Sequence, residues 1–175
     1  LWAAGDGAPA RLAETSSSDD GAFRLDFDAR RAGGGVLYLT ARGGAPRGSQ
    51  AAYPALALMA TLGTSAPNKV TINELTTVAS VWTGAQFLKD GALSGPALGL
   101  RIAAGNVPNL VDLASGGLGP VIQDPLNSTQ TTSLATMNTL AGLLAGCVVQ
   151  VTPDACSKLF DASTPPGGAT PTDTL

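Results

Sequence analysis

The sequence contains no histidine, and this absence excludes a large share of enzyme chemistry. None of the 175 residues is His, so Ser-His-Asp and Cys-His nucleophile systems, histidine metal sites and histidine pH switches are ruled out together. A phosphate-binding Walker loop is also missing, because Gly33–Gly35 has neither the lysine nor the strand-turn-helix setting that such a loop needs. The sequence therefore predicts a protein that is not an enzyme and that uses no cofactor or metal.

Charge is scarce as well. Charged residues make up 13% of the chain and the formal net charge is −3, without any basic cluster. Nucleic-acid binding needs several phosphate-neutralising Lys or Arg side chains, so it is not expected. No apolar run approaches the roughly 18 residues of a membrane helix, which predicts no membrane span. At 44% hydrophobic residues the chain has enough apolar surface to fold, and its weakly charged, small-residue surface is typical of secreted, assembly-forming proteins.

Carboxylates and aromatic residues offer few candidates for chemistry. A glycosidase needs a pair of carboxylates, yet the only glutamates, Glu14 and Glu74, fall in different parts of the chain. Asp19-Asp20 fits a solvated turn better than a calcium site, since no EF-type loop surrounds it. Trp2 and Trp82 are open to two interpretations, a sugar-stacking platform or core packing; the helical spacing around Trp82 favours the core.

Two cysteines, Cys147 and Cys156, lie close together in the sequence. One interpretation is a disulfide that closes a small loop, which implies an oxidising compartment. The other is a pair of reduced, buried thiols. The intervening residues are typical of a turn between two helices, which favours the disulfide.

Residues 1–45 have the pattern of a β region. Strands are expected at 1–4 and 10–15 around the turn Gly5–Gly7, because Gly-Asp-Gly favours a hairpin. Alternating apolar residues predict a third strand at 23–27, and a continuous apolar run predicts a fourth at 36–42. We therefore expect part of a β-sandwich here.

The period becomes helical over residues 51–162. Helices are predicted at 54–62, 73–89, 96–115, 133–148 and 153–162, with loop-like sequence at 116–130. The helix at 73–89 is strongly apolar, with Leu75, Val78, Ala79, Trp82 and Ala85 on one face that should be buried.

Local signals refine these helices. Thr71 and Glu74 fit a Thr-x-x-Glu capping box at the start of the helix at 73–89, and Ser133 is expected to cap the helix that follows it. Pro108 should kink or split its helix. Residues 163–175, rich in Pro, Gly and Thr, are expected to form a linker or tail.

Several segments resemble known secreted proteins. Ser18-Asp-Asp-Gly-Ala-Phe-Arg-Leu25 and Val36-Leu-Tyr-Leu-Thr-Ala41 are similar to carboxypeptidase-regulatory-like (transthyretin-like) β-domains. The helical block includes Thr71-Ile-Asn-Glu-Leu-Thr-Thr-Val-Ala-Ser80 and Leu134–Cys147, and it resembles one that follows such domains in large secreted bacterial proteins. The resemblance implies an α+β chain, with a partial Ig-like sandwich followed by a small helical bundle, in an extracellular, multidomain setting. It implies no activity.

These features together predict a structural role. The chain begins at Leu1 and stops at Leu175 without terminal signals, so we expect a segment of a longer polypeptide. Only four strands are found where such sandwiches have about seven, so copies of the chain are expected to complete the sheet by strand addition beside residues 1–4 or 36–42. The expected interface residues are Leu1, Trp2, Val36 and Tyr38. The alternative is an adhesion or glycan-binding module at the cell surface, with surface glycans as partners.

Overall fold

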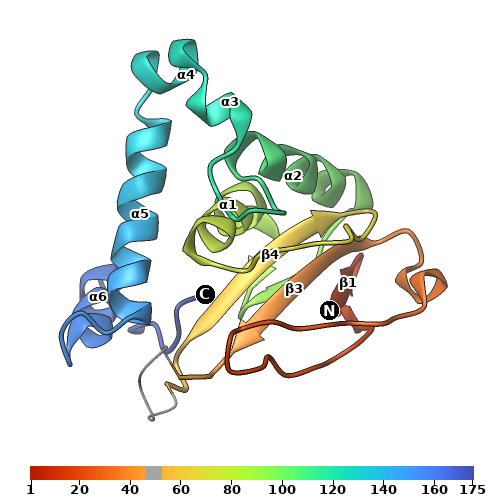
Figure 1. The fold of residues 1–175 in the computed structure, drawn as a ribbon, viewed down its shortest axis with the longest axis horizontal. Coiled ribbons are helices and arrows are strands. Elements are labelled where there is room, and N and C mark those ends of the chain that lie inside the picture. Colours follow the sequence, from red (N-terminus) through yellow and green to blue (C-terminus); the bar gives the residue numbers. More distant parts are fainter. Residues whose placement is uncertain (46–52) are drawn as a thin grey trace.

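A computed structural model describes residues 1–45 and 53–175. It is a mixed α and β fold in which helices cover one face of a small antiparallel sheet and irregular coil covers the other (Figure 1). The sheet has the strand order β2-β1-β3-β4, with β1 Trp2–Ala4, β2 Ala10–Arg11, β3 Val36–Arg42 and β4 Ala57–Gly63. A second, two-stranded ribbon pairs β5 Leu88–Lys89 with β6 Ala92–Leu93. The helices are α1 Glu74–Gly84, α2 Ala97–Leu110, α3 Pro120–Gln123, α4 Pro125–Gln130, α5 Ser133–Val148 and α6 Ala155–Ser163, with 3-10 turns η1 Ala29–Ala32 and η2 Ala85–Phe87.

The alternation of side chains along the strands separates two apolar layers. The register places Trp2 opposite Tyr38 and Ala4 opposite Val36, and these side chains pack on the helix side with Met59, Leu93 and Leu100. The neighbouring residues of the same strands, Leu1, Ala3, Leu37 and Leu39, pack on the opposite face. Both strand predictions, at 1–4 and 36–42, are therefore confirmed as β1 and β3.

The helix predicted at 54–62 is wrong, because this segment forms β4. Ala57–Gly63 pairs antiparallel with β3 from Leu37 to Arg42, and Ala57, Met59 and Ala60 are fully buried. A short apolar run of this kind has no period that distinguishes a strand from a helix, and the free side of β3 decides its conformation. The sheet thus continues across the predicted boundary between residues 1–45 and 51–162, whose first two residues, 51–52, lie outside the described part.

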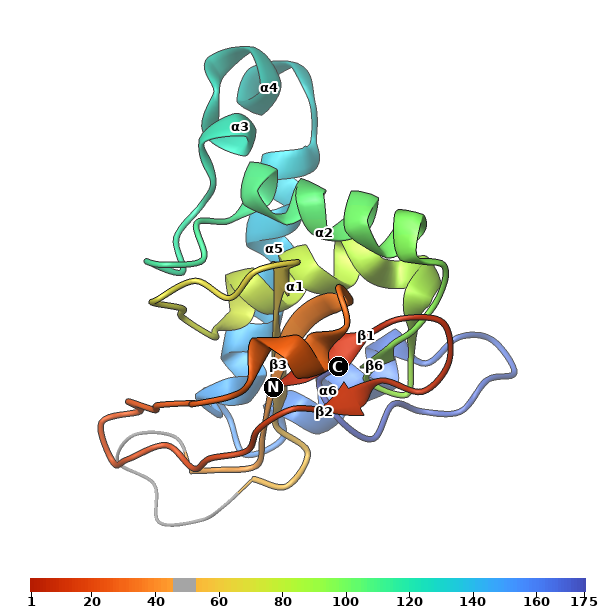
Figure 2. The same cartoon turned by 90° about the vertical axis from the view of Figure 1, so that its right-hand side faces the viewer.

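The coil face shows why an Ig-like sandwich is not confirmed. Phe23, Leu25 and Phe27 were expected in a strand, but they lie in extended chain without strand pairing. They still alternate, because the three side chains are half-buried against the layer that contains Leu37 and Leu39. Irregular coil occupies the place of a second sheet (Figure 2).

The helix predicted at 73–89 is confirmed over α1 and η2, whereas Leu88–Lys89 form β5. Of the face predicted to be buried, Ala79 is fully buried and Leu75 and Val78 are half-buried, but Trp82 and Ala85 are exposed. The residues that are fully buried are small, namely Thr76, Thr77, Ala79, Ser80 and Gly84. Trp82 was expected in the core and is 42% exposed. Small side chains let the helix backbone approach β4 closely, while Leu75 and Val78 pack half-buried against the apolar cluster that Ala79 shares with α2 and α5.

The capping box lies two residues from the predicted one. Asn73 Oδ1 accepts a hydrogen bond from the Thr76 amide at 3.0 Å, and Thr76 Oγ1 accepts one from the Asn73 amide at 2.9 Å. Thr71 instead donates from Oγ1 to the Ala114 carbonyl at 3.0 Å, and Glu74 is the first residue of the helix, where a carboxylate favours the helix dipole. The predicted pair of Thr71 and Glu74 is therefore corrected to Asn73 and Thr76.

Proline had the opposite effect to the one expected. Pro120 and Pro125 begin α3 and α4 within the predicted loop at 116–130, since the missing amide costs nothing in the first turn of a helix. Pro108 was predicted to kink or split a helix of 96–115. That helix, α2, ends at Leu110, and Pro108 lies in its last turn.

The last two helices follow the predictions closely. α5 covers the predicted range and buries Met137, Ala141 and Leu144 at helical spacing, although its N-cap is Thr132 and the predicted cap, Ser133, is its first helical residue. Cys147 and Cys156 form a disulfide with a Cα–Cα distance of 4.4 Å, which joins α5 to α6. The predicted pairing is confirmed.

Candidate interaction groove and the edge of the sheet

An apolar groove of about 430 Å³ opens where α1, α5, α6 and the C-terminal tail, residues 164–175, meet. The described side chains that line the groove are uncharged: Thr77, Val78, Val81, Trp82, Leu140, Leu143, Leu144, Leu159, Ser163, Thr174 and Leu175. We name this set the groove.

Helix geometry places these residues on one surface. Val78, Val81 and Trp82 recur at helical spacing on α1, and Leu140, Leu143 and Leu144 do the same on α5. Trp82, Leu140 and Leu143 are between 42% and 53% exposed. Large apolar side chains that are exposed next to each other mark interaction sites more often than chance placement does. The groove is therefore the part of the molecule best suited to bind an apolar partner.

A second apolar surface lies on α2. Leu98 and Ile102 are 71% and 58% exposed, and their spacing of four residues places them one above the other on the same face of the helix. Neither residue lines the groove, and α2 and α5 lie to different sides of α1 in Figure 1, so this ridge is a separate surface. We name Leu98 and Ile102 the ridge.

The outer edge of β4 is closed by hydroxyl groups instead of another strand. The Met59 amide donates to Thr77 Oγ1 at 3.0 Å, and the Thr61 amide donates to Ser80 Oγ at 2.8 Å. The same Thr77 hydroxyl donates to the Asn73 carbonyl at 2.7 Å. One helix thus satisfies two alternate amides of an edge strand.

The tail closes the next position along the same edge. Thr174 Oγ1 accepts from the Ala57 amide at 2.8 Å and donates to the Ala57 carbonyl at 2.6 Å, while its own amide donates to the Ala55 carbonyl at 3.0 Å. Arg42 and Asp173 form an ion pair at 2.6 Å. The predicted linker at 163–175 is therefore docked on the sheet through its last residues.

The four residues predicted as an assembly interface do not form one surface. Leu1, Val36 and Tyr38 are buried at 7%, 2% and 1% exposure. Burial raises the pKa of the Tyr38 hydroxyl, which accepts a long hydrogen bond from the Leu93 amide at 3.4 Å. Trp2 is half-buried. These residues form part of the core, with Leu1 on one face of the sheet and the other three on the helix side.

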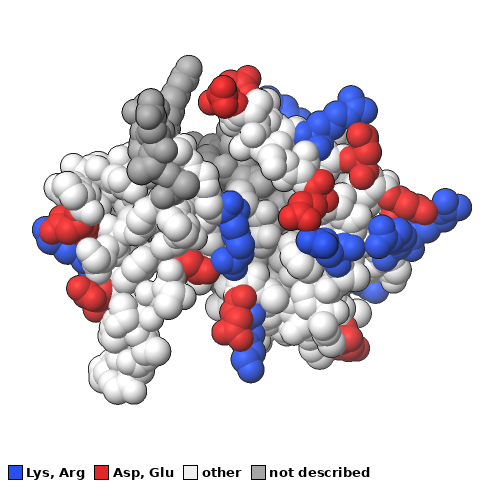
Figure 3. All heavy atoms as spheres, turned by 90° about the horizontal axis from the view of Figure 1, so that it is seen from below, with Lys and Arg blue, Asp and Glu red and all other residues white. Residues whose placement is uncertain are grey.

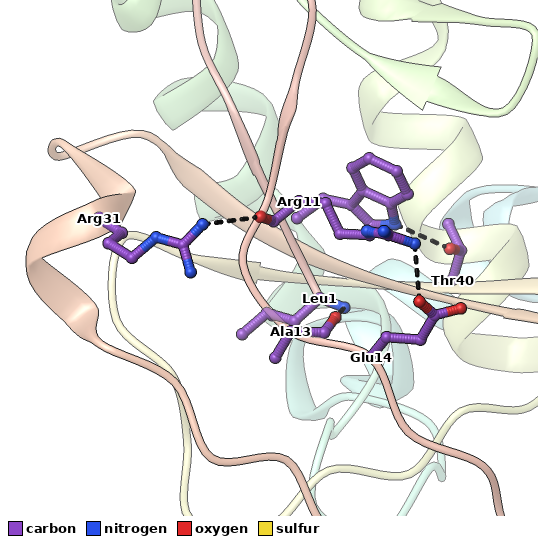
Figure 4. Close-up of polar contacts among 7 residues, drawn as sticks. Leu1, Arg11, Ala13, Glu14, Arg31 and Thr40 are labelled. Carbon is purple, nitrogen blue, oxygen red and sulfur yellow. Dashed lines mark hydrogen bonds and ion pairs between the residues drawn. The ribbon is translucent and has the colours of Figure 1, made fainter.

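The surroundings of Leu1 and Trp2 show how this part of the sheet is held (Figure 4). The Trp2 indole stacks on Tyr38 with a centroid distance of 6.4 Å and donates to Thr40 Oγ1 at 3.1 Å. The Leu1 nitrogen donates to the Ala13 carbonyl at 2.8 Å. Arg31 reaches the carbonyls of Arg11 and Leu12 at 3.4 Å. The indole of Trp2 is thus engaged by its own chain.

Strand addition beside β1 or β3 has little room. β1 lies between β2 and β3, and β3 lies between β1 and β4. The register pairs β1 only with Val36–Tyr38, so within the described residues Thr40–Arg42 are paired on the β4 side alone. On β3, this short stretch is the part that could receive another backbone; on β1, Ala4 has a partner in β3 but none in β2.

Charged side chains gather on the coil that covers the sheet (Figure 3). Exposed ion pairs join Arg11 to Glu14, Arg24 to Asp26 and Arg30 to Asp28. The hydrogen bonds from Arg30 lower the pKa of the Asp28 carboxyl. These pairs are local in sequence and exposed to water, so they contribute little to stability.

The described part of the chain has neither a cluster of metal ligands nor a membrane-spanning helix. Its Cys, Asp and Glu side chains form no group of three or more that could hold a metal ion. None of its helices is both long and apolar enough to span a bilayer.

No family model, no curated protein and no solved structure matches this chain.

Sequence reasoning missed most of the residues that matter in these two sites. Thr77, Ser80 and Thr174 are ordinary polar residues in the sequence, and a hydroxyl that closes a sheet edge leaves no spacing pattern there. One partial signal was present in the sequence. The small residues Thr77, Ser80 and Gly84 recur at helical spacing, and it is this small-residue side of α1 that is fully buried.

Proposed function

We propose that this chain is a non-enzymatic structural module of an extracellular assembly, and that it associates with copies of itself through the groove. The groove carries the proposal, because it exposes Trp82, Leu140 and Leu143 side by side without any charged lining residue among those described. Burial of such an apolar surface against a partner lowers the free energy of the complex, because the surface is removed from water.

The ridge on α2 is the surface of a second copy that fits best. An amphipathic helix binds an apolar groove through anchors at i and i+4, and Leu98 and Ile102 have this spacing and high exposure. Groove and ridge are different surfaces, so their contact is head-to-tail. Head-to-tail contacts that do not close into a ring give filaments.

The compartment is inferred from the disulfide and from the resemblance. Disulfides persist in oxidising environments, which include the outside of the cell, and Cys147 pairs with Cys156. The resemblance to secreted bacterial proteins with a regulatory-like β-domain supports the same location and a multidomain setting. We propose strand addition only at Thr40–Arg42, as a contact secondary to the groove.

The decisive experiment measures association with one surface blocked at a time. Leu143→Asp places a charge in the groove, and Ile102→Asp places one on the ridge. Each variant should weaken self-association about tenfold or more, as expected for a charge buried against an apolar partner. Equimolar mixing of the two variants should restore one good contact per pair, seen by sedimentation velocity as a heterodimer.

Asn138→Asp is the matched control, because Asn138 is exposed on α5 outside the groove. It adds the same charge to the same helix and should leave association unchanged. A wild-type chain that stays monomeric at millimolar concentration contradicts the proposal, and so does unchanged association of the Leu143→Asp variant.

Glycan binding remains a second candidate because Trp82 presents 42% of its surface, and exposed indoles stack on sugar rings. Trp82→Ala should then abolish binding on a glycan array, whereas Trp2→Ala should not, since the Trp2 indole is stacked on Tyr38. Loss of glycan binding with Trp2→Ala alone would contradict this assignment.

A further inference from the structure

We propose that Asp173–Leu175 act as an exchangeable latch, so that the latch of one copy closes the β4 edge of another. The inference deepens the proposed self-association by naming a second contact and its residues, and it rests on that proposal only for the identity of the partner.

The latch makes few contacts with the sheet, and an identical copy of the chain could provide each of them. Thr174 bonds both backbone groups of Ala57, and its amide bonds the Ala55 carbonyl. Asp173 pairs with Arg42, and Leu175 packs on the apolar layer that contains Met59 and Tyr38. The groups that bond to the latch belong to Arg42 of β3, Ala57 of β4 and Ala55 just before β4. Another copy of the chain presents the same groups with the same geometry.

The connection to the latch is exposed. Residues 165–170 are exposed throughout, and they include Pro165-Pro166-Gly167-Gly168. The stretch 165–172 can span about 26 Å when extended. A segment that is held at one end by a few bonds and joined by an exposed connection exchanges between protomers at low cost, since the bonds lost in one copy are regained in the other.

The position of the latch also connects it to the groove. Thr174 and Leu175 belong to the lining of the groove. When they leave, Leu175 withdraws from the apolar layer and the groove loses one wall. A copy that has released its latch exposes the backbone groups of Ala57 and part of the apolar layer. In a crowded assembly, binding the latch of a neighbouring copy is therefore more favourable than leaving this edge of β4 open.

The Arg42–Asp173 pair allows exchange to be measured in the whole chain. Arg42→Asp sets a new carboxylate against Asp173, and Asp173→Arg sets a second guanidinium against Arg42, so each variant repels its own latch and that of an identical copy. In an equimolar mixture, exchange between unlike copies pairs the introduced arginine of one variant with the introduced aspartate of the other, and it restores the native pair of Asp173 with Arg42. Native mass spectrometry should show about tenfold more heterodimer than either homodimer. The double variant, Arg42→Asp with Asp173→Arg, pairs its own latch again and should behave as the wild type.

All variants are made in the Ile102→Asp background as well, which blocks the contact between groove and ridge and leaves the residues that line the groove beside the latch unchanged. Heterodimers that persist in this background support exchange even if association through the groove fails. A mixture with no more dimer than the two variants measured separately overturns the latch, and it does so whether or not the groove variants change association. A third outcome also overturns the proposal. If the single variants are destabilised, the double variant is as stable as the wild type, and the mixture contains no heterodimer, then the latch acts only within one copy.

Discussion

In two stretches of the β4 edge, backbone amides donate to side-chain hydroxyl groups, but the hydroxyls come from a helix in one stretch and from the C-terminal tail in the other. The amides of Met59 and Thr61 donate to hydroxyls of α1, whereas the amide of Ala57 donates to Thr174 of the tail. Thr77 and Ser80 are almost fully buried, at 2% and 1% exposure, while Thr174 is only half-buried at the end of an exposed connection. The same amide-to-hydroxyl hydrogen bond is thus a fixed part of the core in the stretch covered by α1, and a detachable contact in the stretch covered by the tail.

The largest expected effect comes from removing the disulfide, which holds the helix that carries the tail. Cys147→Ala with Cys156→Ala should lower the free energy of unfolding by roughly 2–3 kcal/mol, because the closed loop restricts the unfolded chain. The loss should be uneven along β4. Hydrogen exchange of the Ala57 amide should accelerate more than that of the Met59 and Thr61 amides, measured by NMR.

The wild type provides the reference for this measurement, since its Ala57 amide should already exchange fastest of the three. Equal acceleration at all three amides would show that the tail is no more detachable than α1.

The next effect comes from the fixed stretch. Ser80→Ala leaves the Thr61 amide without its acceptor in the core, which should cost about 1–3 kcal/mol, measured by urea unfolding. Thr61→Val is the contrasting variant at the same place. Thr61 Oγ1 is the one buried side-chain oxygen of the described residues that has no hydrogen-bond partner, so its removal should be neutral or stabilising. Equal destabilisation by both variants would contradict the assigned role of Ser80.

The smallest effect is expected at the detachable stretch. Thr174→Val keeps the shape of the side chain and removes both bonds to Ala57, which should lower the free energy of unfolding by about 1 kcal/mol or less, since water can replace them. Thr172→Val makes the same change at an exposed residue of the tail and should have no measurable effect. A loss for Thr174→Val as large as that for Ser80→Ala would mean that the two stretches are equivalent.

The parts of the fold that followed from sequence are those in which a local pattern and the tertiary structure agree. The run Val36–Arg42 is apolar and bounded by glycines, and it forms β3. Met137, Ala141 and Leu144 repeat at helical spacing, and they form the buried face of α5. In each case, the side chains alone decide which surface is buried.

The parts that failed depend on partners remote in sequence. The run Ala57–Gly63 has no decisive period, and only pairing with β3 makes it a strand. Asn73 caps α1 while its side-chain amide donates to the Gly116 carbonyl at 2.9 Å, a contact that Thr71-x-x-Glu74 gave no reason to expect. The groove was not predictable either, because its walls come from α1, α5, α6 and the tail, and their meeting is a property of the whole fold.

The close fit of α1 on β4 also bears on aggregation. An edge strand with free amides is a template on which other chains add indefinitely, and weakly charged proteins lack the repulsion that would prevent it. Here the side of the sheet most exposed to that risk is occupied by side chains that cannot be extended by a further strand. The β4 edge is therefore a poor template for amyloid-like growth even when many copies of the chain are close together, because its outward amides at Ala57, Met59 and Thr61 are already bonded.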